Sequence, residues 1–148
     1  MTSPLADADR PFRPRFARVV TISIAVVVLL LTALLVGAVS MVTWGDRIGI
    51  ALVGLAVAWF CWREAAVVAV PDERGLTVRN LFVRRRLEWA EIVDVRFGEG
   101  RPWVQLDLAD GDTLPVMAIQ RADGATAQHE ARRLATLVAR HTTTRLDD

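Results

Sequence analysis

The sequence predicts a chain in two parts: a hairpin of two transmembrane α-helices, then a small antiparallel β domain that ends in one α-helix. Hydrophobic residues make up 53% of the chain and the mean hydropathy is +0.32, which is more apolar than an average soluble domain. The excess is concentrated between Val19 and Trp62. Beyond Trp62, short alternating runs are followed by a final stretch with helical spacing, which is the order expected of a β domain with a terminal helix.

The first transmembrane helix is predicted from Val19 to Val42, a run without any charged residue. At about 1.5 Å per residue this run is long enough to cross a hydrocarbon core of about 30 Å. The second apolar run, Ile48–Trp62, is short for a span, but the flanking residues 44–45 and 65–66 bring it close to full length. We expect a second span there, and the alternative is a shallow re-entrant segment.

The distribution of arginines predicts the orientation of this hairpin. The loop between the two runs offers only Arg47, beside Asp46. The flanks hold more: Arg10, Arg13, Arg15 and Arg18 before the first run, and Arg63, Arg74 and Arg79 after the second. The positive-inside rule then predicts an inner-membrane (cell membrane) protein with both termini in the cytoplasm. A cleaved signal peptide is the competing interpretation, although the apolar stretch is longer than a signal core normally runs.

The β domain is predicted from runs of alternating apolar and polar residues separated by turn residues. The expected strands are Ala65–Val70, Leu76–Arg79, Arg84–Glu88, Ile92–Phe97, a strand around Val104–Leu108, and Thr113–Ala118. Between Thr126 and His141 the apolar residues take the spacing of one helical face: Ala127, Ala131, Leu134, Leu137 and Val138. The expected organisation is a basic cytoplasmic tail (residues 1–18), the hairpin (19–64), the β domain (65–141) and a flexible tail (142–148).

A resemblance to a known family agrees with this organisation. Gly75–Arg79, then Arg84–Leu87, then Trp89–Ile92 followed by Val93–Val95 resemble the core pattern of bacterial PH-like domains. The arrangement resembles in particular the membrane-anchored actinobacterial proteins known as low-molecular-weight antigen PH domain proteins. The resemblance covers about residues 65–141. It implies a PH-like fold, with about six antiparallel strands in a curved sheet or open barrel and a C-terminal helix at one end, and it implies no reaction.

A cluster of arginines is the main candidate binding site. Its members are Arg79, Arg84, Arg85, Arg86 and Arg101. Because the predicted domain follows the second span with almost no linker, a basic hairpin there could meet anionic lipid headgroups, at about 1 kcal/mol per arginine. The alternative is a solvated hairpin whose arginines blunt a sheet edge or pair with Glu88 and Glu91.

The aromatic and acidic residues receive more ordinary interpretations. Trp89 and Ile92 are expected in the core, whereas Trp103 falls out of phase with its strand and could contact a membrane or a partner. Three acidic residues, Asp107, Asp110 and Asp112, are expected to form a solvated turn rather than a calcium or catalytic site. We predict no catalytic residues, no metal site and no cofactor, because nucleophile, Walker and dinucleotide motifs are absent.

These observations predict a non-enzymatic, membrane-anchored binding module at the cytoplasmic face, which binds protein, anionic lipid or both. The alternative is a small accessory subunit of a larger membrane complex, such as a respiratory or envelope assembly, with a membrane protein as partner. A net charge of +1 gives no reason to expect nucleic acid as a partner.

Overall fold

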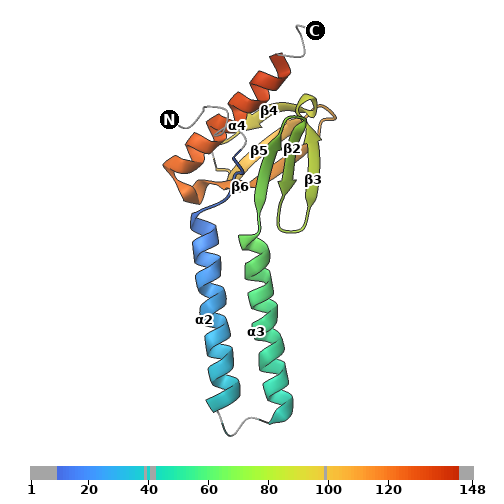
Figure 1. Cartoon of the computed structure of the whole chain (residues 1–148). Helices are drawn as coiled ribbons and strands as arrows, with labels where there is room; N and C mark the ends of the chain where they lie inside the picture. The colour runs from blue at the N-terminus through green and yellow to red at the C-terminus, as the bar shows by residue number, and fades with distance from the viewer. Residues whose placement is uncertain (1–9, 39, 41–42, 99, 144–148) are drawn as a thin grey trace. The chain divides into compact units, whose positions relative to one another are not determined.

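The computed structural model describes residues 10–38, 40, 43–98 and 100–143 (Figure 1). The chain divides into two compact units. The first is Phe16–Ala66, and the second combines the residues up to Arg15 with those from Val67 onward. The β domain therefore includes residues from both sides of the helices in the sequence.

The first unit is a pair of helices, α2 (Phe16–Ala38) and α3 (Trp44–Ala65), both long and apolar enough to cross a membrane. Helix α2 starts before the predicted Val19, because arginine is a good helix former and lets the helix extend beyond the apolar run. The two helices approach closely at Gly54, where a Cβ would lie 2.2 Å from the hydroxyl oxygen of Thr32. Only glycine fits at this crossing.

The start of α3 has a complete capping box. The Thr43 hydroxyl accepts a hydrogen bond from the backbone N–H of Asp46, and the Asp46 carboxylate accepts one from the backbone N–H of Thr43. Arg47 also donates to the backbone carbonyl of Val36, near the end of α2, at 2.8 Å. The Arg47 contact ties the first turn of α3 to the last turn of α2.

The β domain contains two three-stranded antiparallel sheets, which strand pairing does not close into a barrel. The order in the first sheet is β1 (Val68–Asp72), β2 (Gly75–Arg79) and β3 (Arg84–Glu88), and in the second β4 (Ile92–Arg96), β5 (Trp103–Leu108) and β6 (Thr113–Gln120). A 3-10 helix, Trp89–Glu91, joins the sheets. Gly75 has no room for a side chain, since a Cβ there would lie 1.9 Å from the backbone oxygen of Leu87 on β3.

Helix α4 (Ala125–Thr143) packs against the sheets after a second 3-10 helix, Arg121–Asp123. The five apolar residues predicted to share one helical face are all buried: Ala127, Ala131, Leu134, Leu137 and Val138. The alternating residues of β5, Val104, Leu106 and Leu108, are buried as well. The predicted fold class is therefore confirmed.

The first strand differs from its prediction. The sequence analysis placed it at Ala65–Val70, whereas α3 continues to Ala65 and β1 runs from Val68 to Asp72. Pro71, which was expected in a turn, is paired with Leu76 inside the strand. Because β1 lies at the edge of its sheet, the missing N–H of a proline is tolerated there.

The residues before α2 are part of the domain, which the sequence analysis did not expect. Phe12 is 0% exposed and forms an antiparallel bridge with Ala69 of β1, with N···O distances of 2.8 and 3.1 Å. The guanidinium of Arg133 on α4 lies 3.8 Å from the centre of the Phe12 ring. Pro14 is also fully buried. Phe12 and Pro14 thus supply part of the buried interior of the domain.

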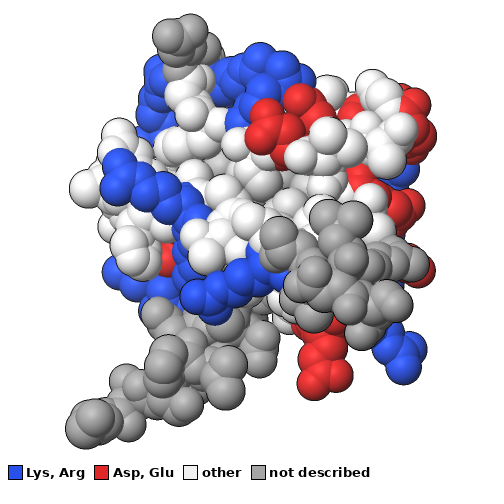
Figure 2. Space-filling model, turned by 90° about the horizontal axis from the view of Figure 1, so that it is seen from above, with Lys and Arg blue, Asp and Glu red and all other residues white. Residues whose placement is uncertain are grey.

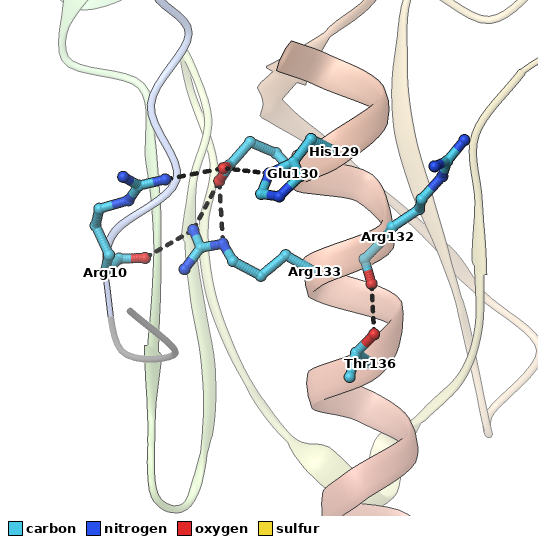
Figure 3. A network of polar contacts seen from close by, with 6 residues as sticks. All are labelled: Arg10, His129, Glu130, Arg132, Arg133 and Thr136. Atoms are coloured by element: carbon cyan, nitrogen blue, oxygen red, sulfur yellow. Dashed lines mark hydrogen bonds and ion pairs between the residues drawn. The ribbon is translucent and has the colours of Figure 1, made fainter. Parts of the chain in front are cut away.

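A polar network holds this N-terminal segment on α4 (Figure 3). Glu130 pairs with Arg10 at 3.0 Å and with Arg133 at 2.7 Å, and Arg133 also donates to the backbone carbonyl of Arg10 at 2.9 Å. Further along, the backbone N–H of Arg15 donates to the carboxylate of Asp123. The segment is therefore fixed at both ends, up to the residue at which α2 begins.

Candidate functional site: the β2–β3 turn

The turn between β2 and β3 lies at one end of the first sheet (Figure 1). The two strands pair from Gly75 opposite Glu88 to Arg79 opposite Arg84. The four residues between them, 80–83, form a turn closed by a hydrogen bond from the backbone N–H of Asn80 to the carbonyl of Val83, at 2.8 Å. Arg79 and Arg84 thus face each other where the turn begins and ends.

Asn80 anchors the turn on the second sheet. Its side chain is buried, and its amide nitrogen donates to the backbone carbonyl of Pro115 on β6 at 2.7 Å. Its amide oxygen accepts from the backbone N–H of Met117, also on β6, at 3.2 Å. An asparagine that satisfies both a donor and an acceptor of another strand restricts the orientation of the turn that contains it.

The outer part of the turn is apolar and exposed. Phe82 is 70% exposed and Val83 54% exposed. The flanking Arg79 and Arg84 are exposed, and neither forms an ion pair with a described residue. Adjacent apolar side chains between two unpaired cations have the amphipathic character that the water–membrane interface favours.

The other arginines of the predicted cluster have different environments. Arg85 pairs with Asp110 at 3.3 Å and with Asp112 at 3.9 Å, and Arg86 pairs with Asp72 at 2.9 Å. The pairing considered from the sequence was with Glu88 and Glu91, but the acidic partners come from β1 and from the β5–β6 turn. These carboxylates offset the charges of Arg85 and Arg86.

Arg101 and Trp103 lie apart from this turn. Arg101 precedes β5 and hydrogen bonds through its guanidinium to the side-chain oxygen of Gln105. Trp103 is half-buried at the start of β5, opposite Gln120 of β6. The structure thus places Arg79 and Arg84 together at one turn, and neither Arg101 nor Trp103 belongs to the described contacts of that turn.

Trp89 and Ile92 are both buried in the core of the domain. The indole N–H of Trp89 donates to the backbone carbonyl of Asp72 at 2.9 Å, and its ring stacks on His141 of α4 with 4.7 Å between ring centres. Among the described residues, no group of His, Cys, Asp and Glu side chains is arranged to hold a metal ion.

The acidic residues considered as a calcium or catalytic group are engaged in ion pairs. Asp107 pairs with Arg96, while Asp110 and Asp112 pair with Arg85. On the face shown in Figure 2, both arginine and acidic side chains surround an uncharged area.

The strand register also shows at which end of the first sheet the turn lies. Arg79 lies opposite Val68, the first residue of β1, and Val68 is three positions after the last residue of α3. The β1–β2 turn, with Arg74, lies at the other end of the same sheet. The β2–β3 turn therefore lies at the end of the sheet at which β1 starts.

Sequence reasoning missed the apolar part of this site. It treated residues 80–83 only as a turn, although three adjacent large apolar residues, Leu81, Phe82 and Val83, are unusual in a β-turn, where Gly, Pro, Asn, Asp and Ser dominate. That departure from ordinary turn composition was the available signal. The role of Asn80 had no signal in the sequence, because its partners on β6 lie 35 and 37 positions away.

Comparisons with known proteins identify the domain. Residues 66–136 match the family described as bacterial PH domain. Uncharacterized proteins of Mycobacterium tuberculosis and Mycobacterium bovis are each 34% identical to this chain over 96 residues, which are 65% of this chain and 62% of each relative. The alignment thus spans less than two thirds of those relatives, and no solved structure matches this chain significantly. The resemblance read from the sequence is confirmed: the domain that follows the two helices belongs to the bacterial PH domain family.

Proposed function

We propose that this protein is a non-enzymatic, membrane-tethered binding module. Helices α2 and α3 anchor it in the cell membrane, and the β2–β3 turn of its PH domain contacts anionic lipid headgroups at the cytoplasmic face. Membership of the bacterial PH domain family supports a binding module. The observation that carries the lipid contact is the exposed pair Phe82 and Val83 between the unpaired Arg79 and Arg84.

The bridge between Phe12 and Ala69 supports the hairpin topology. These residues lie on either side of the two helices in the sequence and are hydrogen bonded to each other. If both helices span the bilayer, the domain can be completed only when both flanks lie on the same side. Cleavage of a signal peptide within the first apolar run would remove Phe12 from the core, which argues against that interpretation. The arginine-rich flanks then favour the cytoplasmic side.

Tethering explains how so small a contact area can suffice. An arginine near an anionic surface contributes about 1 kcal/mol, so Arg79 and Arg84 together contribute about 2 kcal/mol, or roughly a 30-fold shift in the bound-to-free ratio. Such a contact is weak for a freely diffusing protein. In a domain joined to a membrane helix by only a few residues, the effective lipid concentration is high enough for this contact to be populated.

The test measures the membrane depth of a spin label at position 82. Cys61 is the single cysteine of the chain, so a Cys61→Ser background allows Phe82→Cys to be labelled alone. The full chain is reconstituted in nanodiscs of phosphatidylcholine, with or without phosphatidylglycerol. We expect the label at position 82 to become accessible to oxygen and protected from a water-soluble nickel complex when phosphatidylglycerol is present.

Two controls separate lipid contact from general exposure. A label at Val93, which is 65% exposed on β4 of the other sheet, should remain in water in both lipids. Adding Arg79→Gln and Arg84→Gln should return the label at position 82 to water, whereas Arg74→Gln, at the opposite end of the sheet, should not. A label at position 82 that stays water-accessible in both lipids would contradict the proposed contact.

A second candidate function is that of a small accessory subunit of a larger membrane complex. Most large apolar side chains of both helices are exposed, and a Cβ at Gly37 or Gly49 would meet nothing within 4 Å, which leaves room for a partner's helix. Purification through a C-terminal tag in mild detergent distinguishes the two. A stoichiometric membrane-protein partner favours the accessory subunit, whereas recovery of the chain without one favours the tethered module.

A further inference from the structure

A cleft separate from the β2–β3 turn lies between strand β4 and helix α4. Its volume is about 400 Å³, within the range of roughly 300–1,000 Å³ that small-molecule sites occupy. One wall contains Val95 and Phe97, whose alternate positions along the chain place them on one face. The opposite wall is one face of α4, formed by Gln128, Ala131, Arg132 and Ala135, and the lining is completed by Gly98, Arg121 and Gly124.

One part of this cleft is apolar, and small residues leave space there. Val95 and Phe97 are half-buried and pack against the hydrophobic core. Facing them, Ala131 and Ala135 occupy positions four residues apart on α4, where larger side chains would close the space. The combination leaves an open cleft between a strand and a helix, with an apolar wall at Val95 and Phe97.

Two of the described lining residues are charged: both are arginines, and neither has an ion-pair partner among the described residues. Arg132 extends from α4 away from the network of Arg10, Glu130 and Arg133, and its side chain takes no part in that network (Figure 3). Arg121, on the 3-10 helix before α4, is exposed and likewise unpaired. By contrast Arg133, the next residue after Arg132, is held by Glu130 at 2.7 Å.

We propose that this cleft binds a single-chain amphiphile with an anionic head, a phosphate or a carboxylate. The apolar chain lies against Val95 and Phe97, and the head is bound by Arg121 and Arg132. Guanidinium groups suit such heads because they donate two parallel hydrogen bonds to phosphate or carboxylate oxygens. Among the described residues, no acidic side chain lines the cleft to compete for the arginines. The site shares no residue with the β2–β3 turn and does not depend on lipid contact there.

The test uses the full chain in phosphatidylcholine nanodiscs, titrated with octyl phosphate in a calorimeter, with the partition heat of empty nanodiscs subtracted. We expect saturable binding of one molecule per chain. Inorganic phosphate has the head without the chain, and octyl glucoside has the chain without the anion. Both should bind at least about tenfold more weakly. Equal affinity for inorganic phosphate would reveal a simple anion site and overturn the proposal, as would the absence of saturable octyl phosphate binding.

Variants assign the binding to the cleft. Arg121→Gln combined with Arg132→Gln should weaken octyl phosphate binding by about tenfold or more, and Ala135→Leu should reduce it by occupying the cleft. Arg140→Gln, on the same helix but outside the cleft, should leave binding unchanged. All four altered positions are exposed, so the domain should remain folded, which thermal unfolding checks. Unchanged affinity in both the double variant and Ala135→Leu would place the ligand elsewhere and refute the assignment.

Discussion

Replacing Phe12 with alanine tests whether the segment before α2 is part of the domain core. The Phe12 ring is 0% exposed, in contact with the core and beneath the guanidinium of Arg133. Burial of a phenylalanine removes about 150–250 Å² from water, and at about 25 cal/mol per Å² this contributes about 4–6 kcal/mol. Alanine retains part of that area, so we expect Phe12→Ala to lower the free energy of unfolding by about 3–5 kcal/mol.

Native-state hydrogen exchange, followed by mass spectrometry on the full chain in nanodiscs, measures this effect in the domain alone. The amides of β5 lie in the central strand of the second sheet, so their exchange reports unfolding of the domain. A loss of about 3–5 kcal/mol corresponds to exchange that is faster by about two to three and a half orders of magnitude. The matched control is Phe82→Ala, the same change at a residue that is 70% exposed, which should alter exchange by less than about threefold.

The reasoning fails if β5 amides in Phe12→Ala exchange within about tenfold of the parent rate. That result would mean that the Phe12 side chain contributes little to the stability of the domain. It would also remove the argument that both flanks of the hairpin must lie on the same side of the membrane. Equal effects of Phe12→Ala and Phe82→Ala would likewise contradict the difference in burial on which the prediction depends.

Three further substitutions test other contacts. Asn80→Ala leaves a carbonyl and an N–H of β6 without their partners and should lower domain stability by about 1–3 kcal/mol in thermal unfolding. Gly75→Ala should destabilise the domain by at least about 1 kcal/mol, because the new Cβ would collide with the backbone oxygen of Leu87. Hydrogen exchange checks this: the amides of β2 and β3 should exchange faster than those of β5. Gly54→Leu should push the helices apart at Thr32, which a longer distance between spin labels on α2 and α3 would reveal; an unchanged distance would contradict the close approach.

The sequence alone was sufficient for the fold class because hydrophobic periodicity is a local signal. The uncharged run after Val19, the alternation in Val104–Leu108 and the helical spacing from Ala127 to Val138 each specify an element from neighbouring residues. In β5 and α4, the residues predicted to face inward are those that the structure buries. The uncharged run lies mostly in α2, a helix that is long and apolar enough to span a membrane.

The candidate site was predicted only in part. The sequence indicated a basic hairpin at Arg84–Arg86, but the separation into unpaired Arg84 and ion-paired Arg85 and Arg86 depends on Asp72, Asp110 and Asp112. Those partners come from other strands and turns, up to 27 positions away for Arg85 and Asp112 (112 − 85). A periodicity argument assigns a side chain to a face of its strand, but it cannot say which charge lies opposite.

What only the tertiary structure decided are the contacts between segments that are distant along the chain. Phe12 pairs with Ala69, and the two helices lie between these residues in the sequence. Arg133, whose guanidinium lies over the Phe12 ring, comes from α4 near the other end of the chain. The cleft that we propose as a ligand site likewise exists only because β4 and α4 leave space between them. Such contacts depend on how complete elements pack, and packing is set by the shapes and volumes of many side chains at once. Local patterns record which residues are apolar, whereas the fold determines which of them meet.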